Sequence, residues 1–225
     1  MSGERTCSPD TFLMNQKGYR AIIRQFLKGV EWAGPRSVSI LIHGHAGDYN
    51  WADTELAEMT ATKRPPPIKR LISQHHIFAT PESRKKDKGE YCLDHDLKLR
   101  DVLARYLFAN GYRGIDQVSV RHIPGNPDAH IGNLYFELDN GHENDAQLRE
   151  KLERWAGPGA FQVVFVMAHR YGDTGLEDRR LTRLFELSSR ILYHKPNRIL
   201  GACYSQFLKD GVMRNVRGKE RPLSP

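Results

Sequence analysis

The sequence has no long hydrophobic run, and none of its apolar segments approaches the roughly 20 residues that a membrane-spanning helix needs. Its mean hydropathy of −0.60 and its 27% of charged residues are typical of a soluble globular protein. The first residues, from Met1 to Cys7, lack the apolar stretch of a secretion signal. We therefore expect a cytoplasmic protein that has no membrane partner.

Cysteine is scarce, and several common catalytic motifs are missing. Cys7, Cys92 and Cys203 lie far apart without paired spacing, so we expect reduced thiols rather than a disulfide framework. The sequence contains no Gly-rich phosphate-binding loop and no Gly-x-Ser-x-Gly nucleophile motif. These absences argue against P-loop, dinucleotide-binding and serine hydrolase functions.

Positive charge is in excess, with a net charge of +7 and a sequence pI of about 9.4. A basic surface favours polyanions, because binding releases their condensed counterions. The basic residues concentrate between positions 63 and 88, where Glu82 and Asp87 are the only acidic residues. The members of this basic cluster are Lys63, Arg64, Lys69, Arg70, Arg84, Lys85, Lys86 and Lys88.

The order of elements around this cluster predicts a winged helix-turn-helix over residues 1–93. Apolar spacing predicts helices at 11–29, 54–60 and 68–75. The apolar run at 38–42 fits either a helix or a strand. A charged turn and a return segment at 90–93 follow. In such a module the second helix enters the major groove and the wing contacts phosphates, so the basic cluster is the predicted DNA-binding surface. The alternative is a small helical domain whose charged loop is solvated, or a protein-binding module.

Residues 94–212 alternate between helix and strand patterns, which predicts an α/β/α sandwich. The segment 161–168 is almost entirely apolar, as expected of a strand that is covered on both faces. The remaining elements are expected as helices at 97–110, 145–155 and 181–192, and as strands at 118–120, 134–138 and 198–202. We expect the basic tail, 213–225, to have no regular structure.

Three carboxylates surround the strand predicted at 134–138. Asp128 precedes it, while Glu137 and Asp139 lie near its end and share one side, because side chains of a strand alternate. Carboxylates that meet at one place repel each other unless a cation is present. Asp128, Glu137 and Asp139 are therefore predicted ligands of Mg²⁺ or Mn²⁺, which prefer oxygen donors. The alternative is that Asp139 begins an ordinary turn.

Lys151 is predicted to complete a catalytic site with these three carboxylates. It lies eight residues after Glu143, near the same helix face. There it could stabilise charge on a phosphate, or it could be a solvated lysine paired with Glu143. The preceding helix offers His95 and Asp101, of which Asp101 is the better candidate to join the site.

These features resemble the replication-relaxation family of plasmid and conjugative-element proteins, in which a winged helix precedes a PD-(D/E)xK nuclease-like domain. The similarity spans about residues 38–210. Its marks are residues 94–97 with Asp101, 127–129, 136–143 and Lys151. Asp139 departs from the PD-(D/E)xK pattern, which has a lysine there.

The resemblance implies an accessory or regulatory protein of a mobile element, which acts in plasmid replication, mobilisation or transcription control. Its partners would be double-stranded DNA and replication or conjugation proteins, and a homodimer is a candidate assembly. The nuclease-like domain would be either inactive or a Mg²⁺-dependent DNA endonuclease. A protein-interaction scaffold is the third alternative.

Overall fold

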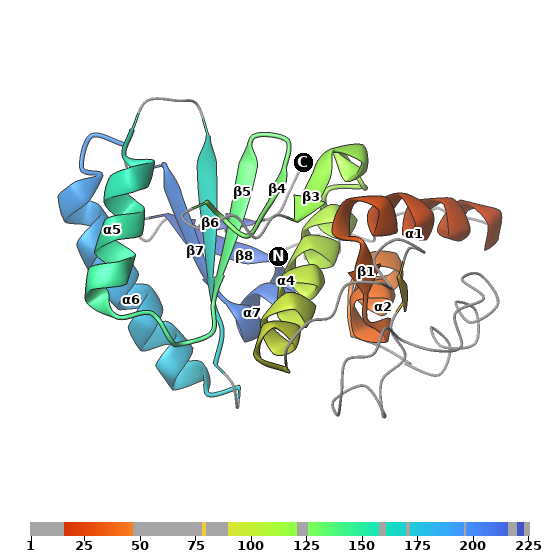
Figure 1. Ribbon diagram of the computed structural model, residues 1–225, viewed down its shortest axis with the longest axis horizontal. Helices are drawn as coiled ribbons and strands as arrows, with labels where there is room; N and C mark the ends of the chain where they lie inside the picture. Colours follow the sequence, from red (N-terminus) through yellow and green to blue (C-terminus); the bar gives the residue numbers. More distant parts are fainter. Residues whose placement is uncertain are drawn as a thin grey trace, which may run out of the picture.

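A seven-stranded mixed sheet, in the order β3-β4-β5-β6-β7-β8-β9, forms the centre of the computed structural model (Figure 1). The structure describes residues 16–46, 78–79, 90–120, 126–157, 161–169, 172–195, 197–215 and 220–222. No helix in these ranges is long and apolar enough to cross a membrane. The strands are β3 (Val118–Val120), β4 (Ala129–Ile131), β5 (Leu134–Asp139), β6 (Gln162–Met167), β7 (Ile199–Cys203), β8 (Val212–Asn215) and β9 (Glu220–Pro222).

Helices connect the central strands and cover the sheet. The helices are α1 (Gln16–Val30), α2 (Pro35–His43), α4 (Glu90–Ala109), α5 (Asp145–Trp155), α6 (Thr174–Ile191) and α7 (Tyr204–Asp210), with a 3₁₀ turn at Ile115–Gln117. Strands β5, β6 and β7 run parallel through the crossovers α5 and α6, and antiparallel strands extend both sides. The carboxyl ends of β5, β6 and β7 therefore meet at one edge.

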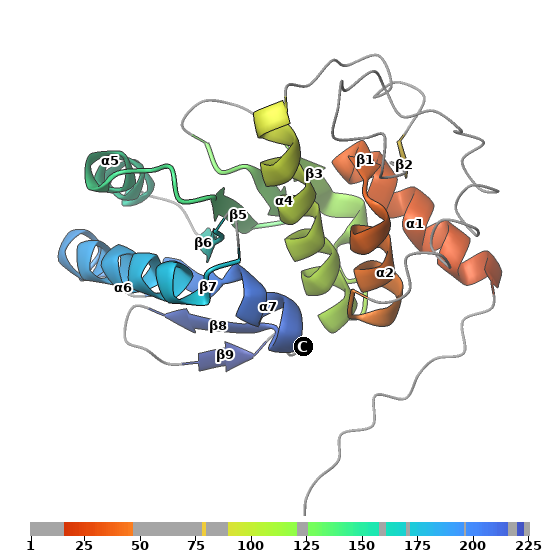
Figure 2. The ribbon, with the colours of Figure 1, turned by 90° about the horizontal axis from the view of Figure 1, so that it is seen from below.

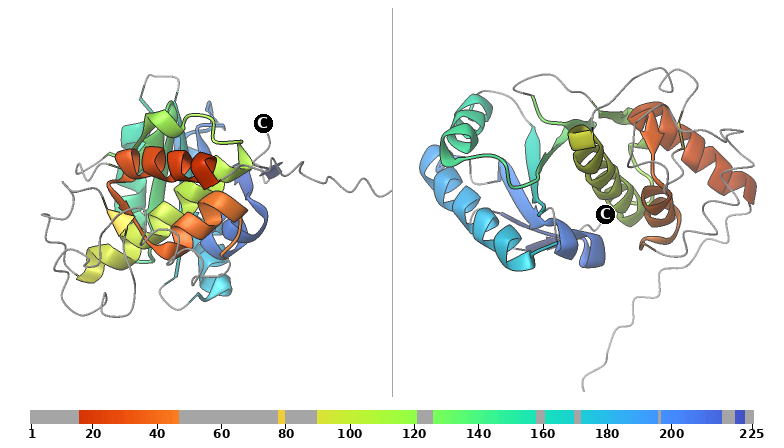
Figure 3. Two further views of the ribbon diagram at one scale, coloured as in Figure 1. Left: turned by 90° about the vertical axis from the view of Figure 1, so that its right-hand side faces the viewer. Right: turned by 60° about the horizontal axis from the view of Figure 1, so that its bottom comes forward.

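The sheet has a hydrophobic layer on each face. Phe165 and its odd-numbered neighbours in β6 pack against α5 and α6, whereas Val164 and Val166 belong to the core that includes α1, α2, α4 and α7. Figures 2 and 3 show the resulting order, with α5 and α6 on one side of the strands and α4, α2 and α1 on the other. The described part of the chain is thus a mixed α/β structure with helices on both faces of the sheet.

The N-terminal helices share one core with the sheet. Gly29 of α1 lies so close to β3 that an added Cβ would approach the carbonyl oxygen of Val118 to 2.5 Å. Arg100 of α4 is buried and donates hydrogen bonds to the carbonyl oxygens of Val30 (2.9 Å) and Trp32 (2.5 Å), which holds the end of α1 against α4. The boundary expected between residues 93 and 94 falls inside α4.

Two local predictions need correction, and the structure assigns one segment whose type the sequence left open. Residues 90–93 are not the return strand of a wing but the start of α4, because extending an existing helix costs less than nucleating a separate element. The apolar run at 38–42 belongs to α2. The tail contributes β8 and β9 to the sheet, because Met213 and Asn215 are buried where β8 pairs with β7.

Most residues of the predicted winged helix lie outside the described part of the chain. Strand β1 (Trp32–Ala33) pairs with β2 (Phe78–Ala79), and the first predicted helix corresponds to α1. The helices predicted at 54–60 and 68–75 lie outside the described residues. So do all members of the basic cluster, Lys63, Arg64, Lys69, Arg70, Arg84, Lys85, Lys86 and Lys88, whose contact with DNA stays a prediction.

Candidate functional site

Asp128 and Glu137 meet at the carboxyl end of β5, as the predicted site requires. The register of the β4–β5 hairpin pairs Ala129 with Phe136. Asp128, which precedes Ala129, therefore lies beside Glu137, which follows Phe136. The backbone N–H of Asp128 donates to Oε2 of Glu137 (3.2 Å), and the N–H of Leu138 donates to Oδ2 of Asp128 (2.9 Å). Glu137 is 3% exposed, so its carboxyl group lies inside the protein.

Helix α5 brings Lys151 to these carboxylates. Asn144 caps the helix by accepting from the N–H groups of residues 146 and 147, and the side chain of Gln147 returns a bond to the Asn144 backbone. This start places Lys151 about two turns into the helix, where its ammonium donates to Oε1 of both Glu137 and Glu143. Lys151 thus pairs with Glu143, as the alternative interpretation expected, and also donates directly to Glu137 of the predicted site.

His95, rather than Asp101, joins the site from α4. Its Nε2 lies 3.2 Å from Oδ2 of Asp128 and 2.9 Å from the carbonyl oxygen of Leu138. The preference for Asp101 was wrong, because that carboxylate lies in a separate buried cluster. It accepts hydrogen bonds from Ser37 (2.6 Å) and Tyr204 (2.7 Å).

Asp139 pairs with Arg180 of helix α6. Its Oδ1 accepts from the N–H of Gly141 (2.8 Å), and its Oδ2 accepts from Nη2 of Arg180. The same Nη2 donates to the carbonyl oxygen of Glu143 (2.9 Å). Glu143 and Arg180 were absent from the predicted site; the eight-residue spacing from Glu143 to Lys151 was the signal for the first, and nothing in the sequence marked the second.

Burial raises the pKa of two carboxyl groups of the site. Burial raises the pKa of Glu137, the nearby Asp128 charge adds to this, and the result is about 8 even though Lys151 opposes both effects. Burial also raises the pKa of Glu143, against the opposing charge of Lys151. Oε2 of Glu143 is buried without a hydrogen-bond partner in the described part of the chain. Both groups are therefore easier to protonate than exposed glutamates, although each accepts a hydrogen bond from Lys151.

Unfolding free energy should fall with rising pH because of His95. Burial by itself lowers the pKa of this imidazole, but Asp128 and Asp96 outweigh it and raise the pKa to about 10. The unfolded value is about 6.5, so the stabilisation is complete below pH 6.5 and is lost as the pH rises toward 10. Urea denaturation at several pH values should show a shallower decline in this window for His95→Gln than for wild type. His194→Gln, in the exposed turn after α6, is the matched control, and equal slopes in all three proteins would contradict the assignment.

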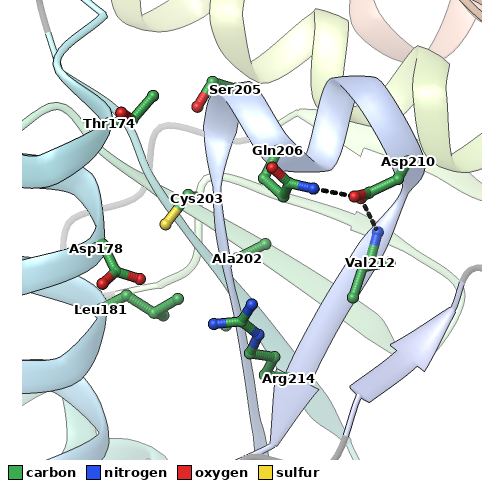
Figure 4. Close-up of a pocket in the computed structure, with 11 residues that line it drawn as sticks. Thr174, Asp178, Leu181, Ala202, Cys203, Ser205, Gln206, Asp210, Val212 and Arg214 are labelled. Atoms are coloured by element: carbon green, nitrogen blue, oxygen red, sulfur yellow. Dashed lines mark hydrogen bonds between the residues drawn. The ribbon is translucent and has the colours of Figure 1, made fainter.

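A cavity of about 360 Å³ lies at the carboxyl end of another strand, β7 (Figure 4). Helix α6 contributes Asp178 to its wall, β8 contributes Arg214, and Cys203 lies at its floor. Burial and the charges of Asp178 and Glu177 raise the pKa of the Cys203 thiol to about 11, which keeps it protonated and poorly nucleophilic. None of the predicted catalytic residues lines this cavity.

No protein-family model, no curated protein and no solved structure matches the chain. The assignment of the site therefore depends on its geometry alone. In the ranges that the structure describes, no group of three or more His, Cys, Asp or Glu side chains is already arranged to hold a metal ion. The ammonium of Lys151 instead lies between the carboxylates of Glu137 and Glu143.

Proposed function

We propose that this protein cleaves DNA phosphodiester bonds with the help of a divalent cation, Mg²⁺ or Mn²⁺. The observation that carries the proposal is the convergence of Asp128, Glu137, Glu143 and Lys151 at the carboxyl end of β5. Glu137 lies in β5, Asp128 and Glu143 lie in the loops before β4 and before α5, and Lys151 lies in α5. The net charge of +7 favours a polyanionic substrate.

The donor set fits a hard divalent cation. Carboxylate oxygens are the ligands that such cations prefer, and Glu143 keeps a buried oxygen without a hydrogen-bond partner among the described residues. Asp128 and Glu137 would be the principal ligands, with Glu143 as a third. Asp139, the third ligand predicted from the sequence, is less suited than Glu143, because both of its carboxylate oxygens already accept hydrogen bonds.

The chain's own residues then have separate tasks. A bound cation would polarise the phosphate and promote ionisation of the attacking water. Lys151 would stabilise the negative charge that develops on the phosphate oxygens. His95 holds the Asp128 carboxylate, while Leu138 N–H donates to the same oxygen and fixes its orientation. The pKa of Glu137 is about 8 in the absence of a cation, so a bound cation would displace its proton.

A DNA-binding regulator with an inactive nuclease-like domain is the second candidate. It is favoured by the pairing of Glu137 and Glu143 with Lys151, and of Asp139 with Arg180, since these pairs neutralise the carboxylates without an added ion. In both candidates the basic cluster would bind double-stranded DNA. A role in a mobile element, partners from replication or conjugation, and a homodimer belong to the same proposal.

A cleavage assay with the full chain separates the candidates. Supercoiled, linear and single-stranded DNA would be incubated with millimolar Mg²⁺ or Mn²⁺, beside a gel-shift assay in EDTA. We expect metal-dependent nicking of the supercoiled plasmid. Binding without cleavage would support the regulator, and the absence of both would leave a protein-interaction scaffold.

A further inference from the structure

Helices α5 and α6 present a basic side chain at the same position relative to their caps. Asn144 caps α5 and Asp173 caps α6, each through side-chain acceptance of backbone N–H groups. Lys151 and Arg180 each lie seven positions after the cap. Helical side chains lean toward the helix N-terminus, so both long cations reach back to the carboxyl edge of the sheet.

Both cations converge on Glu143. Lys151 donates to its side chain, while Nη2 of Arg180 donates to its backbone carbonyl oxygen at 2.9 Å. Arg180 therefore lies next to the proposed catalytic cluster, although it comes from a different crossover. Its position is fixed by Asp139, a carboxylate that is 2% exposed and is itself held by the N–H of Gly141.

The guanidinium of Arg180 has donors to spare. All of its hydrogen bonds to described residues come from Nη2, and Nε is buried there without a partner. The side chain remains 25% exposed, whereas that of Asp139 is 1% exposed. Asp139 thus anchors one nitrogen of the guanidinium and leaves Nη1 for another acceptor. A guanidinium stays charged at neutral pH, so Nη1 can donate a charge-assisted hydrogen bond to a phosphate oxygen.

We propose that Arg180 binds a phosphate of the DNA strand beside the site, held there by Asp139. The proposal rests on the proposed function in taking DNA as the ligand, but not on cleavage. It gives Asp139 a task that differs from metal binding.

The test is DNA affinity as a function of salt, measured by fluorescence anisotropy with a labelled duplex and the full chain in EDTA. Arg180→Gln should weaken binding and reduce the slope of log K against log salt by about 1, as expected for one lost phosphate contact. Arg180→Lys should recover part of the slope. Arg179→Gln, which removes the exposed neighbouring arginine of the same helix, is the matched control and should leave the slope unchanged.

A double variant separates phosphate binding from charge balance. Asp139→Asn with Arg180→Gln leaves no unpaired buried carboxylate, so it should fold even where Arg180→Gln alone does not. We expect the double variant to keep the reduced salt slope. Recovery of the wild-type slope would overturn the proposal, because Arg180 would then serve only to neutralise Asp139. A wild type that binds DNA but never cleaves it would refute the nuclease function alone, and the salt slopes would still decide the role of Arg180.

Discussion

Glu137→Gln should strongly reduce metal-dependent cleavage while leaving the fold intact. The substitution removes the buried carboxylate that links Asp128 to Lys151. We expect a rate loss on the order of 10²- to 10³-fold, the range found when one preorganised charge-stabilising group is lost. Glu153→Gln, an exposed site on α5, is the matched control and should retain wild-type activity.

The same variant should behave differently from wild type in thermal unfolding. At pH 9, above the raised pKa of about 8, Glu137 is ionised inside the protein, so its replacement by Gln should leave the metal-free melting temperature unchanged or raise it. Wild type should gain about 2.7 kcal/mol at a metal concentration of 100 Kd. The variant should lose most of that gain. A wild type whose melting temperature does not respond to millimolar Mn²⁺ would refute the cation site and favour the regulator.

The sequence was informative where local signals and strand register agree. Helix α5 was predicted correctly, because Leu148, Leu152 and Trp155 repeat at helical spacing and are buried in the structure. The meeting of Asp128 and Glu137 depends only on a short hairpin, whose two-residue turn includes Gly132 at a positive φ of 58°. Such local geometry leaves little freedom, so residues close in sequence could be placed correctly.

Groups that depend on distant elements could not be placed in this way. Arg180 looks like part of an ordinary charged run, and its contact with Asp139 follows from the crossover that returns α6 to the sheet edge. His95 and Asp101 are six residues apart, so they point to different sides of α4 and cannot both face the site. Apolar spacing could not show which side of α4 faces β5. The tail was misjudged because β8 is stabilised by pairing with β7 across α7, a contact that the local sequence pattern of the tail does not indicate.

Lys151→Met should destabilise the protein in the absence of metal and make it more responsive to metal. The ammonium lies between Glu137 and Glu143, and its loss leaves two largely buried carboxylates without their shared cation. Removing one partner of a buried pair costs about 3–5 kcal/mol. We expect about 3 kcal/mol at pH 9, because the Lys151 side chain keeps 21% exposure. Arg154→Met removes an exposed pair with Glu150 and should cost at most about 1 kcal/mol.

Added Mg²⁺ or Mn²⁺ should then restore much of the lost stability, because the ion no longer competes with an ammonium for the same oxygens. The metal-dependent rise in unfolding free energy should be larger in Lys151→Met than in wild type, even though DNA cleavage falls sharply. Urea denaturation of the variant without and with metal measures the loss of stability and its recovery. A destabilised variant that no divalent cation rescues would identify Lys151 as a purely structural counter-ion. The acidic cluster would then stabilise the fold of a DNA-binding protein and would have no catalytic role.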